Sequence, residues 1–166
     1  MIKSYSSIDF LNEVILKTYK SYLKVYEKEL WNKKYESINF NLNGVSFKSR
    51  LANKTPNKDG YFVSIWTKDE VGKNRPFNFD EFQDKLIINI LDKSKKGQFV
   101  FTKEILAEKG IISSEKNKGK MAIRVYPSWE KDLNNTAYKT QQWQLDYFLD
   151  FSNEVNNSKL KNLYWF

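Results

Sequence analysis

Two stretches in which apolar and polar residues alternate, residues 45–52 and 61–68, place the strongest constraint on the fold. Alternation with a period of two is typical of a β-strand that buries one face. Between them, Pro56 and the run Asn57-Lys58-Asp59-Gly60 supply the residues of a turn. A further strand is expected near residues 36–42, before an Asn43-Gly44 hairpin turn, so that the three strands would form an antiparallel meander.

The expected strands would also gather positive charge. Their outward positions and the turn between them carry Lys48, Arg50, Lys54, Lys58 and Lys68. Two interpretations remain open for this region. It is either an ordinary solvated sheet face with a lysine-rich turn, or a surface that binds phosphate groups.

Apolar residues at helical spacing indicate helices at several places in the chain. Ser6-Ser7 predicts the start of a long amphipathic helix that runs to about Leu30. Thr102 and Gly110 predict the two ends of a helix over residues 103–109. A last helix is expected from Asn134 to about Ser152, followed by a polar tail whose apolar end, Leu-Tyr-Trp-Phe, should dock on the body or on a partner.

The remaining patterns decide the fold class. Residues 98–101 and 121–127 have strand patterns, whereas residues 85–91 fit either a buried strand or a helix end. The order of elements predicts an α/β (α+β-like) fold with a mainly antiparallel mixed sheet flanked by helices, which resembles the restriction-endonuclease-like fold. The length of 166 residues predicts one domain, with an N-terminal helix in residues 1–30 and a C-terminal tail in residues 153–166.

The chain contains no cysteine and no histidine. These absences exclude thiol nucleophiles, imidazole bases and zinc proteases, and any metal would need oxygen ligands, as magnesium does. Nucleases of the restriction-endonuclease-like fold carry an acid-x-Lys motif, which does not occur here, and Trp66 precedes Thr67-Lys68 where the acid would stand. We therefore predict no catalytic residue, no metal site and no cofactor. An irregular carboxylate site would have to draw on Glu36, Asp69, Glu70, Asp80 and Asp84.

The formal net charge is +8, and its excess lies in residues 31–60 and 101–125. A basic patch on strands and turns favours a polyanionic partner such as DNA or RNA, although a lysine-rich surface also serves solubility. The N-terminus has no signal-peptide pattern, and no stretch approaches the ~20 apolar residues that span a bilayer. We expect a cytoplasmic protein without membrane insertion.

The expected last helix carries an unusual set of polar residues. Thr140, Gln141 and Gln144 share one face, and Trp143 and Tyr147 lie together at helical spacing. Glutamine can bond to phosphates or base edges. It can equally cap strand ends while the aromatic residues pack on the sheet, and the sequence does not separate these two roles.

Several separated motifs resemble the MepB family. They begin with Arg50-x-Ala52-x-x-Thr55-Pro56-x-Lys58-x-Gly60-x-Phe62-Val63-x-x-Trp66-x-Lys68 and Arg75-Pro76-Phe77. They continue with Gly97-Gln98-Phe99-Val100-Phe101-x-Lys103, Gly110-Ile111, Gly119-Lys120, Arg124-Val125-Tyr126-Pro127-x-Trp129 and Thr140-Gln141-x-Trp143-Gln144. The resemblance extends roughly from residue 30 to residue 152, and Thr102 departs from it because the family typically has proline there. It implies a bacterial, cytoplasmic protein, from a family named after a multidrug efflux gene cluster, with a nuclease-like α/β fold that suggests nucleic-acid binding.

Together these observations favour a non-catalytic nucleic-acid-binding protein with a basic groove. The residues expected to neutralise phosphate are Arg50, Lys54, Lys58, Lys68, Arg75 and Arg124. Trp66 and Tyr126 are expected to stack on bases, and Thr140, Gln141 and Gln144 to orient the strand. Two alternatives remain: an atypical metal-dependent nuclease or hydrolase, and a regulatory module that binds a protein partner through its C-terminal tail.

Overall fold

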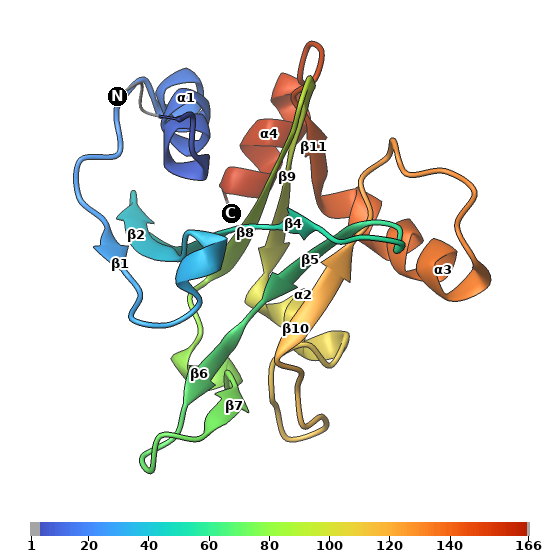
Figure 1. The fold of residues 1–166 in the computed structure, drawn as a ribbon. Coiled ribbons are helices and arrows are strands. Elements are labelled where there is room, and N and C mark those ends of the chain that lie inside the picture. The colour runs from blue at the N-terminus through green and yellow to red at the C-terminus, as the bar shows by residue number, and fades with distance from the viewer. Residues whose placement is uncertain (1–3, 166) are drawn as a thin grey trace.

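A six-stranded mixed sheet forms the centre of this computed structural model, which describes residues 4–165 (Figure 1). Its strand order is β1 (Glu27–Lys28), β2 (Ile38–Leu42), β3 (Val45–Leu51), β8 (Lys85–Asp92), β9 (Lys95–Thr102) and β11 (Phe148–Asp150). All neighbours are antiparallel except β3 and β8, which run parallel. The predicted mixed, mainly antiparallel sheet with flanking helices is confirmed.

Two tight turns build this sheet. Asn43 and Gly44 both have positive φ, 48° and 81°, as a type I′ turn between β2 and β3 requires. Lys93, with φ 57°, and Ser94 form the two-residue loop that connects β8 to β9. The apolar run in β8 is therefore a strand, which resolves the choice between strand and helix left open by its periodicity.

A second, three-stranded sheet has the order β10 (Ala122–Val125), β5 (Tyr61–Ser64) and β4 (Asn53–Lys54). The chain of β5 continues into a hairpin formed by β6 (Trp66–Lys68) and β7 (Asn74–Pro76). The predicted meander is thus wrong, because β5 does not pair with β3. Instead, β3 pairs with β8. The residues of β8 from Lys85 to Ile90 are all buried, as expected for a central strand that is covered on both faces.

Four α-helices accompany the sheets: α1 (Ser7–Tyr19), α2 (Lys103–Glu108), α3 (Asn135–Gln144) and α4 (Asn157–Tyr164). Short 3-10 turns lie at Lys33–Tyr35, Phe79–Glu81 and Leu145–Tyr147. The start and end of α2 agree with the prediction, since the Thr102 hydroxyl accepts a hydrogen bond from the N–H of Ile105 and Gly110 follows with φ 69°.

Two helices are shorter than expected. The first ends at Tyr19 because Lys20 adopts a left-handed conformation and its N–H closes the helix on Leu16, so residues 21–30 run on without helix. The last predicted helix ends at Gln144, since residues 148–150 pair with the edge of β9.

Two apolar cores lie on opposite faces of the central sheet. One packs beneath α1 and α4 and includes Phe10, Ile87 and Tyr164. The other lies between the two sheets and includes Val63, Ile88 and Phe101. The buried Tyr164 belongs to the C-terminal tail, so the expectation that this tail docks on the body is confirmed for the described part of it.

Two buried cations on β3 meet one carboxylate from the residue that directly follows β1. Glu29 pairs with the amino group of Lys48 and, at 2.8 Å, with Nη1 of Arg50. Arg50 also donates a hydrogen bond to the hydroxyl of Ser37, and Lys48 to the Oδ1 of Asn39 at 3.0 Å. Both cations are almost completely inaccessible to solvent, so Glu29 supplies the charge that makes their burial tolerable.

Replacement of Glu29 tests this cluster. Glu29→Ala leaves two buried cations without a carboxylate, and we expect it to lower the free energy of unfolding by about 3–5 kcal/mol. Urea denaturation of the variant provides the measurement. Glu27→Ala is the matched control, because Glu27 lies two residues before Glu29 and is exposed. Equal stability of the two variants would contradict the assignment.

The same cluster predicts a pH dependence of stability. Burial lowers the pKa of the Lys48 amino group to about 8, against the opposing effect of Glu29. Between pH 8 and the ordinary lysine value near 10.5, the unfolded chain binds the extra proton, so stability should rise with pH, by about 1.4 kcal/mol for each unit of pKa depression. Urea titrations from pH 7.5 to about 9, below the ordinary tyrosine pKa of about 10, should show this rise. Lys48→Met should abolish it, whereas the exposed Lys28→Met should retain it.

Candidate functional site

A cavity of about 300 Å³ opens at the free edge of β10, and we call it the β10 pocket. It lies between the edge strand, the end of α2 and the inner side of α3. Its lining residues are Lys109, Ile111, Lys120, Ala122, Ile123, Arg124, Tyr126, Thr140, Trp143 and Gln144. Three of them are cations and none is acidic. In residues 4–165, four other cavities of comparable size each have at least one Asp or Glu in their lining.

Two buried glutamines attach α3 to β10. The Gln144 side chain accepts a hydrogen bond from the N–H of Tyr126 and donates one to the C=O of Arg124, both at 2.9 Å. Gln141 donates to the C=O groups of Pro127 and Glu130 at 2.9 and 3.1 Å. The alternative that these glutamines cap strand ends therefore describes the structure. Direct contact with a nucleic acid is not open to them here, because their amide groups are buried and already bonded.

Arg124 projects from the outer face of β10 and is held by neutral acceptors. Its Nη1 donates to the C=O of Asp59 at 3.0 Å, and its Nη2 donates to the hydroxyl of Thr55. The guanidinium also lies over the ring of Phe62, 5.9 Å from the ring centroid. No carboxylate in residues 4–165 forms an ion pair with it. These bonds orient the guanidinium without neutralising its charge.

The other two arginines are neutralised. Arg50 is fully buried and paired with Glu29, so the prediction that it neutralises phosphate is not compatible with this structure. Arg75 forms a two-point ion pair with Glu81, with N–O distances of 2.7 and 2.9 Å. Of the three arginines in the sequence, Arg124 thus keeps its charge available at the surface.

Aromatic side chains border the cavity. Tyr126 packs closely on Gly60, where an added Cβ would lie 2.7 Å from the tyrosine ring and φ is +76°, so only glycine fits this position without strain. Trp143 is half-buried against Phe101, with ring centroids 5.4 Å apart, and the amino group of Lys109 lies 5.4 Å from the Trp143 ring.

A second aromatic and cationic group lies at β6, in the two-stranded β6–β7 sheet into which the chain of β5 continues. Trp66 stacks on Trp31 with ring centroids 6.4 Å apart. The amino group of Lys68 lies 5.0 Å from the Trp31 ring and 5.4 Å from the Trp66 ring, and it donates to the side chain of Asn74 at 2.9 Å. Sequence reasoning missed Trp31, because a helix was expected to end just before it.

The structure separates the predicted site residues. Those that line the β10 pocket are Arg124, Tyr126, Thr140 and Gln144, while Trp66 and Lys68 form the second group. Lys54 is exposed and lies 3.7 Å from Asp92, and Lys58 is exposed in the turn before β5. The sequence-based site omitted Lys109, Lys120 and Trp143, although Lys120 follows Gly119 within one of the family motifs.

Three of the five candidate acidic residues, Glu36, Asp69 and Asp84, accept hydrogen bonds within the fold. Glu36 accepts hydrogen bonds from Ser7 at the start of α1, and Asp84 accepts two from Ser46. Asp69 accepts from the backbone N–H groups of Val71 and Lys73 in the β6–β7 turn. Within residues 4–165, no three acidic side chains gather so that they could hold a metal ion.

In the part of the chain that the structure describes, no helix has the length and apolar character needed to cross a membrane. The tail residues Leu160 and Tyr164 are buried against the body, and Trp165 stacks on Tyr19 with ring centroids 5.0 Å apart. The part of the tail that was expected to meet a partner is therefore largely used by the fold itself.

Comparisons with known proteins place this fold and sequence in a family. None of the curated proteins compared matches the chain. A crystal structure of MepB is 42% identical in sequence, with a TM-score of 0.80, over 91% of this chain and 100% of that chain. A bacterial homing endonuclease, I-Ssp6803I, is 12% identical with a TM-score of 0.44, over 82% of this chain and 88% of its own, and neither fold nor function is inferred from it. The family model described as MepB-like matches residues 29–150, and the chain therefore belongs to the MepB-like family.

Proposed function

We propose that this protein binds nucleic acid at the β10 pocket and the adjoining outer face of β10. The observation that carries the proposal is Arg124. Its guanidinium is positioned by two neutral oxygen acceptors, is not neutralised by any carboxylate in residues 4–165, and lines a cavity with two further cations.

The chemistry of these groups suits a phosphodiester. An arginine fork donates two parallel hydrogen bonds to phosphate oxygens, and lysines add charge without fixed geometry. Lys109 and Lys120 come from α2's C-terminal end and from the loop before β10, so a phosphate in the pocket would meet cations from three elements. Trp143 and Tyr126 offer ring surface beside them, and base stacking on aromatic rings is largely independent of sequence. Binding without strong sequence preference follows from this combination.

The charge of the pocket favours an anionic ligand, as a nucleic acid is. A neutral or cationic ligand would leave three cations without a counter-charge. The proposed contacts are Lys109, Lys120 and Arg124 to phosphate, with Tyr126 and Trp143 beside the bases. Gln141 and Gln144 support these contacts indirectly, because they fix α3 against β10.

The first functional prediction concerns Arg124. Arg124→Ala should weaken binding to single- and double-stranded oligonucleotides of any sequence by about tenfold or more, since a hydrogen bond to a charged group is worth roughly 1.5–3 kcal/mol. The slope of log affinity against log salt should fall by about 0.7–0.9 for the lost phosphate contact. Arg124→Lys should keep most of the slope and lose part of the affinity. Fluorescence anisotropy at several salt concentrations measures both quantities.

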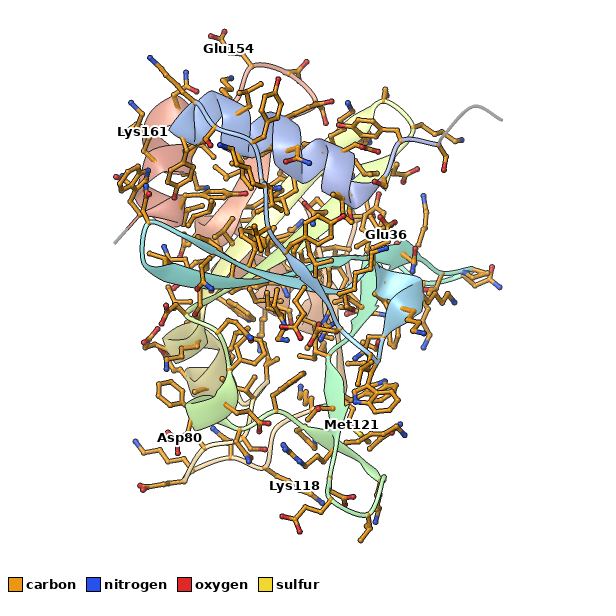
Figure 2. All side chains as sticks on the ribbon, turned by 90° about the vertical axis from the view of Figure 1, so that its left-hand side faces the viewer. Glu36, Asp80, Lys118, Met121, Glu154 and Lys161 are labelled. Carbon is orange, nitrogen blue, oxygen red and sulfur yellow. The ribbon has the colours of Figure 1, made fainter. Side chains whose placement is uncertain are left out.

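Lys161→Ala is the matched control for this experiment. Lys161 is exposed on α4, and Figure 2 shows it at the opposite end of the molecule from Lys118 and Met121, which flank Lys120 in sequence. The Lys161→Ala variant removes one positive charge at a residue that does not line the pocket. A folded Arg124→Ala protein with the affinity and salt slope of Lys161→Ala would refute the proposal.

The second functional prediction concerns cleavage. The sequence lacks histidine and the acid-x-Lys motif, and the acids Glu36, Asp69 and Asp84 serve as hydrogen-bond acceptors in the fold. Purified protein with magnesium should therefore leave labelled single- and double-stranded DNA and RNA intact in a gel assay. Cleavage that disappears on chelation and in Asp80→Asn or Asp84→Asn would instead establish the nuclease alternative.

A further inference from the structure

The outer face of β5 and β10 connects the β10 pocket to the second aromatic group. Arg124 pairs with Phe62 and Ala122 with Ser64 across the two strands, so their side chains lie on the same face. Pairing continues to Met121, whose C=O accepts a hydrogen bond from the N–H of Ile65 at 2.9 Å. The next positions on this face are Lys120 and Trp66, at the end of β10 that lies nearest the β6–β7 hairpin (Figure 1).

Residues 31–35 cover β5 along this face. Tyr35 packs on Phe62 with ring centroids 6.1 Å apart, and Trp31 stacks on Trp66. Between them, the side chain of Asn32 bonds to the Ser64 hydroxyl and donates to the C=O of Trp66 at 2.7 Å. The accessible strip is therefore β10 itself, with residues 31–35 on one side and α3 on the other.

This strip is about one strand wide, and neighbouring strands lie only about 4.8 Å apart. Its middle position is Ala122, a small side chain that leaves room above the backbone. Cations are found at Lys120 and Arg124, on either side of Ala122, and Lys109 lies at the pocket. The pocket volume of about 300 Å³ is at the lower end of the range for small-molecule sites, which suits one nucleotide and not a base pair.

We infer that the ligand of this surface is single-stranded nucleic acid, and that duplex is disfavoured; this rests on the proposed function of the β10 pocket. One nucleotide occupies the pocket, its phosphate near Arg124 and Lys120 and its base against Trp143 or Tyr126. The strand then follows β10 to Trp31, where a second base stacks on the exposed indole. Phe62, which pairs with Arg124, and Trp66, on which Trp31 stacks, are four residues apart, so the levels of Arg124 and Trp31 are separated by roughly 13 Å along the strand.

Charge alone would not give this preference, because a duplex has the higher density of phosphates. The selectivity comes from the aromatic rings, which need unpaired bases with free faces. Replacement of Trp31 can test whether aromatic rings cause this preference, since Trp31 is 38% exposed and its loss should leave the fold intact. Trp165 is a matched control, because it is 45% exposed and stacks on Tyr19 of α1, outside the β10 pocket and the Trp31–Trp66 pair.

Fluorescence anisotropy with labelled oligothymidylates of increasing length, and with the same strands annealed to oligoadenylate, tests the inference. The full chain should bind the single strands at least about tenfold more tightly than the duplex, as one or two stacked bases would give. Affinity should rise with length until both aromatic positions are spanned and then level off. Trp31→Leu should lose about tenfold in affinity for the longer single strands only, while Trp165→Leu should bind like the unmodified protein.

A second variant tests the pocket without removing a charge. Thr140→Leu places a larger side chain without an aromatic ring in the cavity, at a half-buried position of α3, and should weaken the preference for single strands while leaving the melting temperature nearly unchanged. Duplex binding equal to or tighter than single-strand binding would overturn this inference and leave the proposed function standing. Unchanged single-strand binding in both Trp31→Leu and Thr140→Leu would also overturn it. Failure to bind either form of nucleic acid would overturn the proposed function as well.

Discussion

The contact between Glu29 and two buried cations determines much of this structure. Lys48 and Arg50 stand on a central strand and face the interior, where an unpaired charge would be very costly. Glu29 reaches them from the position just after β1, a strand of only two residues at the sheet edge. Its ion pairs therefore fix the chain just before Trp31, Asn32 and Tyr35. Those three side chains then cover β5, so the interior charge pair also shapes the surface on which the candidate site lies.

Local signals in the sequence predicted the elements whose causes are local. The Asn43-Gly44 turn needs two residues that accept positive φ, and α2 needs a capping hydroxyl and a terminal glycine. The pairing of β3 with β8 could not be read in this way, because it joins segments about 40 residues apart and depends on which strand is apolar on both faces. The end of α3 could not be predicted from local signals either. It depends on the pairing of Phe148 with the edge of β9, which no local sequence pattern indicates.

The candidate site shows the same difference between features with local causes and features that depend on distant parts of the chain. Arg124 and Tyr126 could be selected because strand alternation turns them outward. Arg50 has the same alternation signal, but its accessibility depends on Glu29, which lies 21 positions earlier in the chain. Lys109, Lys120 and Trp143 come from separate elements and meet only in three dimensions. For a basic residue on a strand, the partner across the fold decides between a surface charge and an internal ion pair, and sequence spacing does not identify that partner.

Gln144 has a consequence beyond the position of α3. β10 is the last strand of its sheet, and an open strand edge is a template for pairing with another polypeptide chain. The carboxamide of Gln144 offers one acceptor and one donor, like a peptide group, and bonds to the N–H of Tyr126 and the C=O of Arg124 as a neighbouring strand would. A single side chain thus stands in for a missing strand over part of this edge. It protects the sheet against edge-to-edge aggregation there, while the side chains of the strand stay open on its outer face.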